Sequence, residues 1–411
     1  MQTRRVAVTG TGCVSCIGNS TDEMWKSLLS GKSGISAISK FDTAGFATTI
    51  AGEVKDLALE GVSVKEARRM SEQVRFAFAS AFEAVGQSGI SGNVDPERFG
   101  CIFSTATGGL DAYDKAAENL KNRGSSGVSA LFIPMYLPSG AAGNLALKFN
   151  LQGPGYNVCS ACASGTHAIG EAFRMIRYGE ADAMLCGGTD ACVTPLMLSG
   201  FSSLTALSTR NDEPEKASRP FAADRDGFVL ADGAAALVLE DMEHAKRRGA
   251  LILAEVCGYG ASCDAYHITA PHPDARGSIS AMRRAVSQAG CSVSDIGYIS
   301  AHGTATRLND ICESRAINAL FAGTGVKVSS IKSMTGHAIG AAGAIETVSC
   351  VQSLFHSTLI PTVNCEEQDS EIDLHLTSRH AEKCSIIYAL NNSLGFGGHN
   401  AALVLKKYSG D

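Results

Sequence analysis

The sequence has no hydrophobic run long enough to cross a membrane, no low-complexity segment and no excess of positive charge. Its first apolar stretch, residues 6–9, is followed by Gly10 and Gly12 and is too short for a signal-peptide core or a membrane span. The net charge of −6 at pH 7 argues against nucleic acid or an anionic membrane as the main partner. We therefore expect a cytoplasmic protein that meets any anionic partner through a local basic patch.

The chain also lacks the cysteine spacing of a small disulfide-bonded secreted protein. Its fourteen cysteines are scattered through apolar and glycine-rich segments. Cys159 and Cys162 have C-x-x-C spacing, which redox and zinc sites share, but no second paired motif supplies further ligands. We predict mostly buried thiols, with Cys159 inside a strand, and no metal.

What the sequence does contain is an alternation of short β-branched runs and amphipathic helical stretches. Of its 411 residues, 45% are apolar and 18% charged, enough for a large core. The runs suggest strands at residues 6–9, 100–104, 183–186, 235–239, 298–301 and 401–405, and helices at 71–88, 166–178 and 278–289. This order predicts α/β layers with parallel strands joined by helical crossovers.

Two pairs of segments resemble each other across the chain. Residues 165–172 match 335–342, which sets His167 on His337 and Cys162 on Lys332, and residues 99–107 match 297–304 more loosely. Chance similarity of small-residue turns is the alternative. Because the two matches occur in the same order, we favour a duplicated α/β unit with halves at residues 1–250 and 251–411, whose strand ends converge on one site.

Cys162 lies where a short apolar strand runs directly into a helix. Backbone N–H groups point outward at such a junction and the helix dipole is positive, so we expect the thiolate to be favoured and Cys162 to be a nucleophile. The residues that follow it, 163–165, are small and allow a substrate to approach the backbone.

Two histidines and a glycine-rich turn occupy similar places in the other half. His302 and His337 are each flanked by glycine near the end of a strand. Residues 395–398 form a Gly-Phe-Gly-Gly turn before the last strand. A phosphate cradle is one interpretation, but no helix with a basic residue follows the turn. A turn that presents a backbone N–H and the Phe396 ring fits better.

Together these residues resemble the β-ketoacyl-[acyl carrier protein] synthases of the thiolase-like superfamily, in the synthase I/II branch of Cys-His-His elongating enzymes. The similarity extends along essentially the whole chain. It rests on an ordered set of segments: residues 6–12, the Cys162 junction, 207–211, 218–221, 226–228, 264–267, 302–304, 332–337 and 395–398.

The resemblance implies an α/β, thiolase-like, duplicated five-layer αβαβα fold, with the nucleophile in the N-terminal half and both catalytic histidines in the C-terminal half. It implies a homodimer that needs no cofactor. The expected reaction is the decarboxylative Claisen condensation of an acyl group on Cys162 with malonyl-[acyl carrier protein], in fatty acid elongation. The acyl carrier protein and malonyl-acyl carrier protein are the expected partners.

Three other functions stay open. The first is a ketosynthase of a type II polyketide or aryl-polyene pathway, in which a heterodimer with a chain-length subunit could replace the homodimer. The second is a non-catalytic chain-length partner, which usually lacks the nucleophile. The third is a cysteine hydrolase, which needs a water path and a base, whereas two histidines and the 395–398 turn suit enolate and oxyanion stabilisation.

The resemblance also gives roles to individual residues. The backbone N–H groups of Cys162 and Phe396 would form the oxyanion hole, and His302 and His337 would stabilise the enolate. Around them, Lys332 and Glu346 would support the second histidine, His337. The remaining assignments are Asp264 and Asp310 as supporting acids, Thr107, Phe132, Phe201 and Phe396 as the acyl pocket, and Lys65, Arg68 and Arg69 as the carrier-docking patch.

The sequence departs from the family pattern close to these positions. Arg307 stands where proline is common, Leu394 where phenylalanine is frequent, and Thr107 where isoleucine or glycine is frequent. Threonine is smaller than isoleucine and its hydroxyl needs a partner once buried. We therefore expect the pocket to accept a medium-length, partly polar or unsaturated acyl chain.

Overall fold

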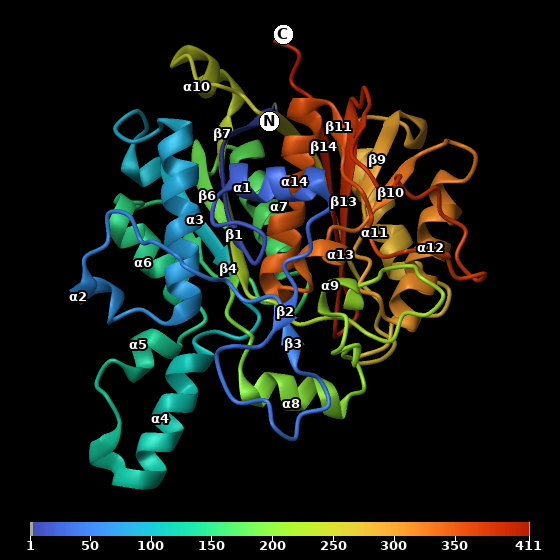
Figure 1. The fold of residues 1–411 in the computed structure, drawn as a ribbon. Helices are drawn as coiled ribbons and strands as arrows, with labels where there is room; N and C mark the ends of the chain where they lie inside the picture. The colour runs from blue at the N-terminus through green and yellow to red at the C-terminus, as the bar shows by residue number, and fades with distance from the viewer. Residues whose placement is uncertain (1–2, 411) are drawn as a thin grey trace.

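Ten strands form one continuous mixed sheet in the computed structural model, which describes residues 3–410 (Figure 1). Their order across the sheet is β10 (Lys327–Ser329), β9 (Ile296–Ser300), β13 (Tyr388–Gly395), β14 (His399–Lys406), β8 (Ala254–Cys263), β1 (Val6–Ser15), β7 (Gly233–Asp241), β6 (Ala183–Asp190), β4 (Phe99–Ser104) and β5 (Gly155–Tyr156). Each expected strand is present, although most are longer than the apolar run that predicted them.

The two halves of this sheet form two β layers, with helices between them and on the outer face of each. Two helices, α7 (Ser164–Arg177) and α14 (Ala342–His356), contact each other and strands from both halves of the chain. Two further pairs cover the outer faces: α3 (Glu72–Ser88) with α6 (Gly140–Phe149), and α11 (Arg276–Ala289) with α12 (Arg307–Phe321). The five-layer αβαβα arrangement implied by the resemblance is confirmed, and α14 is buried along nearly its whole length because it lies in the middle layer.

Further helices and two small two-stranded sheets lie around these layers. The helices are α1 (Thr21–Ser30), α2 (Val64–Ala67), α4 (Leu110–Arg123), α5 (Phe132–Tyr136), α8 (Pro195–Ser203), α9 (Pro214–Ala217), α10 (Met242–Arg247) and α13 (Lys332–Thr335). Two small ribbons pair β2 (Ser36–Ala37) with β3 (Ile50–Ala51) and β11 (Thr358–Leu359) with β12 (Glu382–Lys383). No helix within residues 3–410 is both long and apolar enough to cross a bilayer.

The two halves of the sheet repeat one topology, β5-β4-β6-β7-β1 and β10-β9-β13-β14-β8. A glycine pair marks the innermost strand of each. Side chains at Gly10 and Gly12 would collide with backbone carbonyls of α3, and side chains at Gly258 and Gly260 with those of α11. The same close approach of helix to strand therefore occurs twice, as a duplicated unit requires. The division at residue 250 stays a prediction.

The two sequence matches differ in quality. Residues 99–107 and 297–304 contain β4 and β9, which hold equivalent places in the two halves. The match of 165–172 with 335–342 is out of structural register, because His167 lies inside α7 whereas His337 precedes α14. The expectation of parallel strands was also only partly right. Pairs such as β4–β6 and β9–β13 are parallel, but the central strands β6–β7, β7–β1, β1–β8, β8–β14 and β14–β13 pair antiparallel.

All fourteen cysteines are free thiols, and seven of them are buried. Cys159 is a clear exception, because it is exposed and lies outside any strand. The prediction that it is a buried strand residue was wrong for a simple reason. β5 ends at Tyr156, well before the cysteine.

Candidate active site

Cys162 sits on a strained turn rather than at a direct strand-to-helix junction. Seven residues separate the end of β5 from the start of α7 at Ser164. Ala161, just before the cysteine, has a left-handed φ of 51°, a conformation that costs a non-glycine residue energy. The turn packs against Gly395, where a side chain would come within 2.5 Å of the Ser160 carbonyl oxygen. Strain and close packing together fix the position of the thiol.

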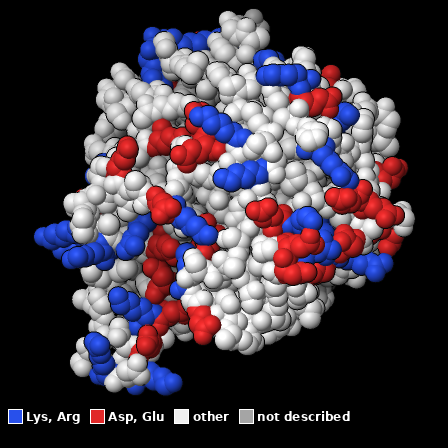
Figure 2. All heavy atoms as spheres, viewed as in Figure 1, with Lys and Arg blue, Asp and Glu red and all other residues white. Residues whose placement is uncertain are grey.

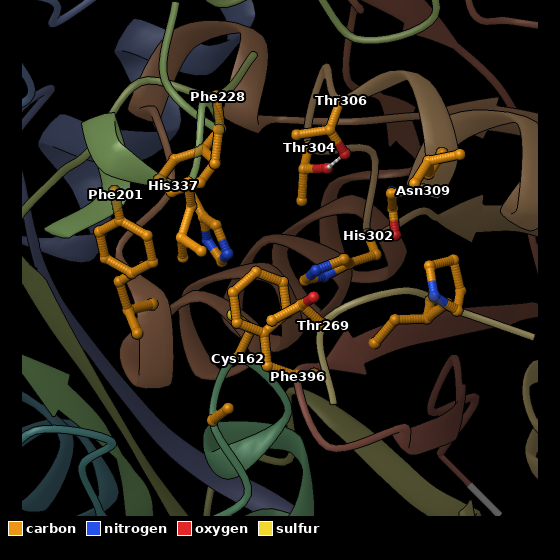
Figure 3. A pocket seen from close by; sticks show the side chains of 18 of the residues that line it. Cys162, Phe201, Phe228, Thr269, His302, Thr304, Thr306, Asn309, His337 and Phe396 are labelled. Carbon is orange, nitrogen blue, oxygen red and sulfur yellow. Dashed lines mark hydrogen bonds between the residues drawn. The ribbon is translucent and has the colours of Figure 1, made fainter. Parts of the chain in front are cut away.

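Two loops of the C-terminal half bring His302 and His337 to this thiol (Figure 3). His302 follows β9 and His337 follows α13. The cysteine sulfur and one ring nitrogen of each histidine all lie within 4.8 Å of one another. The two imidazole rings meet edge to face, with centroids 5.3 Å apart. The sequence prediction that these three side chains converge is therefore correct in its geometry.

Burial dominates the electrostatics of Cys162 and raises the pKa of its thiol to about 12. The expectation that the resting thiolate is favoured was wrong, because removal from water outweighs the stabilising groups. Those groups are the Lys332 ammonium and the backbone N–H groups of Phe396 and of Cys162 itself, which lower the pKa. Two backbone N–H groups thus interact with the sulfur, and two such donors are what an oxyanion hole needs.

Burial favours the neutral form of both histidines. Burial, reinforced by the nearby Lys332 ammonium, lowers the pKa of His302 and of His337 well below the usual value. Lys332 Nζ lies 3.4 Å from His302 Nδ1 and donates to the His302 carbonyl oxygen at 2.5 Å. Because an ammonium only donates, Nδ1 of His302 must accept, which leaves the hydrogen on Nε2. His302 is therefore held as an N–H donor on its other edge.

Lys332 is buried and is held by Glu346, with which it forms a close ion pair. Burial raises the pKa of Glu346 to about 7, while Lys332 lowers it. The resemblance suggested that this pair supports His337, but its hydrogen bonds reach His302 instead. Nδ1 of His337 has no hydrogen-bond partner among the described residues, and its ring packs edge-on against Phe228, with centroids 5.3 Å apart.

Glu313 is a functional neighbour that the sequence did not reveal. Its buried carboxylate accepts from the backbone N–H groups of His302 and Gly303, both at 2.7 Å, and from the Asn392 side chain at 2.7 Å. Burial without a paired cation raises its pKa to about 7. The signal that could have found it is its spacing from Asp310, because two acids three residues apart share one face of a helix.

The other two predicted supporting acids lie one step further from the reacting atoms. Asp310 is buried, accepts from the Thr304 backbone N–H at 3.1 Å and pairs with Arg225 at 3.3 Å. Asp264 accepts from the Asn400 side chain at 2.9 Å, beside the turn that carries Phe396. Each acid therefore holds a loop that presents a site residue, and neither hydrogen-bonds to His302 or His337.

A pocket of about 630 Å³ opens above the three reacting side chains. Its lining includes Thr107, Phe201 and Phe396, as predicted. Phe132 does not line it. This residue lies on α5, half-buried, and stacks on Tyr136, so it does not reach the pocket of its own chain, and its assignment to an acyl pocket stays a prediction. Aromatic residues in the 130s could not be placed without knowing that α4 and α5 extend away from the sheets (Figure 1).

The Thr107 hydroxyl already has a partner within the protein. It donates to the buried Asp190 carboxylate at 2.7 Å and lies 3.6 Å from the Cys192 sulfur. Asp190 accepts four further hydrogen bonds, from Thr105 and from backbone N–H groups of the 106–107 and 340 loops. The hydroxyl is therefore not free to bind a substrate. This removes the structural reason for expecting a polar acyl chain.

The three basic residues predicted to dock a carrier surround the short helix α2. Lys65 lies within it, Arg68 caps its end and Arg69 follows. All three side chains are exposed, and none forms an ion pair within residues 3–410. Figure 2 shows basic side chains gathered over this part of the surface.

Cys162, His302 and His337 also form a set of soft and borderline ligands that could hold a metal ion. The Lys332 ammonium next to His302 opposes a divalent cation there. The arrangement suits a neutral substrate group on which negative charge develops, because N–H donors stabilise such a charge more strongly in a buried site than in water.

Nearly the whole chain is similar to one family of known proteins. The family profile described as "Beta-ketoacyl synthase, N-terminal domain" matches residues 3–245, and "Beta-ketoacyl synthase, C-terminal domain" matches residues 253–366. The 3-oxoacyl-[acyl-carrier-protein] synthase 2 of Vibrio cholerae serotype O1 is 44% identical over 413 residues, which cover 99% of this chain and 100% of that protein.

Solved structures of ketosynthases also match the fold over 99% of this chain. One describes a type II PKS acyl-carrier protein in complex with its ketosynthase bound to the hexaketide; it matches with a TM-score of 0.91 and 34% identity over 99% of this chain and 100% of that chain. The ishigamide ketosynthase/chain length factor matches with a TM-score of 0.92 and 34% identity over the same shares.

Proposed function

The chain belongs to the beta-ketoacyl synthase family, and on that premise we propose that it joins an acyl thioester to malonyl-[acyl carrier protein] by decarboxylative Claisen condensation, giving 3-ketoacyl-[acyl carrier protein] in fatty acid chain elongation. The observation that carries the proposal is the convergence of one thiol and two neutral imidazoles within 4.8 Å at a pocket of about 630 Å³. Cys162 comes from the part of the sequence before residue 250, and both histidines come from the part after it.

In the first step Cys162 takes the acyl group. Its sulfur forms a bond to the acyl carbon, the carbon–sulfur bond to the carrier breaks, and the thiol proton leaves with the carrier's sulfur. The negative charge of the tetrahedral intermediate develops between the N–H groups of Cys162 and Phe396. Such donors act strongly in a site closed to water, and losing one typically costs about 2.7–4 kcal/mol in activation free energy.

In the second step malonyl thioester loses carbon dioxide. The electrons of the broken carbon–carbon bond move into the thioester, so negative charge develops on its carbonyl oxygen as an enolate. His302 and His337 stabilise this oxygen as N–H donors. The low pKa of both imidazoles keeps the rings neutral, so each donates a hydrogen bond through its N–H group without transferring the proton.

In the third step the enolate carbon attacks the acyl carbonyl on Cys162. A carbon–carbon bond forms, the bond to sulfur breaks, and the thiolate takes up one proton from solvent water. The Lys332 ammonium stabilises that thiolate, since it lowers the pKa of Cys162, and it holds His302 as a donor on the edge away from Nδ1. Lys332 is thus a positioning residue in this scheme, with Glu346 as its counterion.

Purified protein given acyl- and malonyl-[acyl carrier protein] should release one carbon dioxide for each 3-ketoacyl product, as measured by radiolabel release and mass spectrometry. His302→Ala and His337→Ala should each suppress carbon dioxide release more than acyl transfer to Cys162, because the enolate appears only in the later step. Carbon dioxide release at the wild-type rate from both variants would refute these roles.

A polyketide or polyene ketosynthase is the second candidate, because one neighbouring structure named above is a type II PKS ketosynthase and the other is a ketosynthase/chain length factor. Its chemistry is the same and its acyl chain differs. Offering the enzyme saturated acyl-carriers beside polyunsaturated and 3-ketoacyl carriers of equal length distinguishes the two. Preference for the saturated chain supports fatty acid elongation, and preference for the others supports the second candidate.

We propose that the enzyme works as a homodimer and docks an acidic carrier protein at Lys65, Arg68 and Arg69. Apolar side chains exposed on α4, α5 and nearby segments support the dimer; they are Tyr113, Leu120, Leu131, Ile133, Tyr136, Leu137, Leu147 and Tyr156. A monomeric mass in light scattering would contradict it. A heterodimer with a chain-length subunit belongs to the second candidate, and a cytoplasmic location stays a prediction.

The docking patch has a direct test. Reversing the charge at Arg68 and Arg69 should raise the KM for acyl-carrier substrates several-fold and weaken its dependence on salt, since exposed charges act mainly on association. Acyl-pantetheine, which lacks the carrier protein, should react unchanged. Unaltered KM values for the carrier substrate at low salt would argue against the patch.

A further inference from the structure

The pocket lining contains two arginines that differ sharply in exposure. The Arg225 side chain is 1% exposed and is paired with Asp310 at 3.3 Å and Asp369 at 2.6 Å. The Arg307 side chain is 76% exposed. Among the described residues that line the pocket, Arg307 is therefore the one cation that faces solvent.

The Arg307 guanidinium is held only loosely. Its partner is Glu371, at 3.0 Å, whose side chain is 45% exposed. Exposed pairs of this kind contribute little to stability, so another anion can replace the carboxylate. The backbone of Arg307 is better fixed, because it begins α12 and its carbonyl oxygen accepts from Arg225. The result is a flexible cation on a rigid base at the pocket opening.

The acids in the lining already have partners. Asp226 is paired with Arg219 at 3.0 Å, and Asp264 accepts from the His272 backbone N–H at 3.0 Å and from the Asn400 side chain at 2.9 Å. Thr269, Thr306 and Asn309 are neutral. A thioester that reaches Cys162 from a carrier protein hangs on a phosphopantetheine arm, whose far end is an anionic phosphodiester. While the thioester is inside the pocket, that phosphodiester must stay near the opening.

We propose that Arg307 binds the phosphodiester of the carrier's phosphopantetheine arm and so sets the preference for carrier-type thioesters; the proposal rests on the function proposed above. A guanidinium presents two parallel N–H donors to phosphate oxygens, and such charge-assisted bonds are about twice as strong as neutral ones. On binding, Arg307 exchanges the Glu371 carboxylate for the phosphate. The exchange breaks no covalent bond.

The test compares two small substrates that differ only in the phosphate, acyl-phosphopantetheine and acyl-pantetheine. In the wild type the phosphorylated thioester should have a KM roughly tenfold lower, as expected for a charge-assisted contact at a partly exposed site. Arg307→Ala should remove that difference by raising the KM for acyl-phosphopantetheine, with kcat and the reaction of acyl-pantetheine unchanged. Arg307→Lys should retain part of the preference.

Glu371→Gln is the matched control, because it frees Arg307 without removing it. It should keep the preference or increase it. Equal KM values for both substrates in the wild type, or equal losses on both in Arg307→Ala, would overturn the proposal. If no condensation occurs at all, the function proposed above fails. The phosphate preference is then read from the rate at which each thioester acylates Cys162, by intact mass.

Discussion

Replacing Lys332 by methionine separates the stabilising role of this residue from its catalytic one. The substitution keeps most of the length of the buried side chain but removes the ammonium group that contacts Glu346 and His302. Breaking a buried pair by removing one partner typically costs 3–5 kcal/mol, and proton uptake by Glu346, whose pKa burial already raises to about 7, keeps the cost near the lower limit. At roughly 2 °C per kcal/mol, we expect Tm to fall by about 6 °C.

The same substitution frees His302 Nδ1, so the ring is no longer held as a donor on its other edge. Loss of one donor to the enolate should slow malonyl decarboxylation about 10²- to 10³-fold. Acyl transfer to Cys162 should slow by less than about tenfold, because its oxyanion donors are backbone N–H groups and only the thiol pKa changes. Radiolabelled carbon dioxide release and intact mass measure the two steps separately.

The double variant Lys332→Met with Glu346→Gln gives the control. Without a buried carboxylate to compensate, it should recover most of the lost Tm while decarboxylation stays slow. If carbon dioxide release recovered together with Tm, Lys332 would be only a structural residue, and the reasoning about the His302 tautomer would be refuted.

Two further predictions concern the acyl pocket and the buried acid behind His302. Thr107→Phe should block long acyl groups while short ones still acylate Cys162. The isosteric Thr107→Val should keep the wild-type chain-length profile and lose about 1–3 kcal/mol of stability, because Asp190 loses one of its hydrogen bonds. If both variants had the same chain-length profile, the residue that sets chain length would have to be sought elsewhere. The pKa of Glu313 in the folded protein, about 7, lies above its unfolded value near 4.5, so between these pH values the folded state binds the extra proton. The stability of the wild type relative to Glu313→Gln should therefore rise as the pH falls from about 7 towards 4.5. Parallel stability curves for these two proteins, followed by denaturant unfolding across that pH range, would contradict the raised pKa.

The positions of the reacting residues were readable from the sequence because local rules place them. Small residues after Cys162, and glycines beside His302 and His337, predicted turns, and a duplicated α/β unit brings the turns of its two halves together. The alternation of strand and helix signals likewise gave the layers.

What the sequence could not give depends on tertiary burial and on the spatial course of surface helices. The pKa of Cys162 follows from how deeply the turn is packed, which outweighs the helix dipole. Phe132 does not line the pocket of its own chain, because it lies on α5, which extends with α4 away from the sheets. Glu313 looked like an ordinary helical acid until its backbone donors were known. The Thr107 hydroxyl found its partner in Asp190, which lies 83 residues away in the chain.

Intact-mass analysis with peptide mapping, after incubation with an acyl-[acyl carrier protein], tests the central claim most directly. The wild type, His302→Ala and His337→Ala should each gain one acyl group on the peptide that contains Cys162. Cys159→Ser, which alters the exposed neighbour in the C-x-x-C pair, should acylate as the wild type does. Cys162→Ser or Cys162→Ala should gain no stable thioester and form no 3-ketoacyl product. An acyl group mapped to Cys159, or chain elongation by Cys162→Ala, would contradict the account.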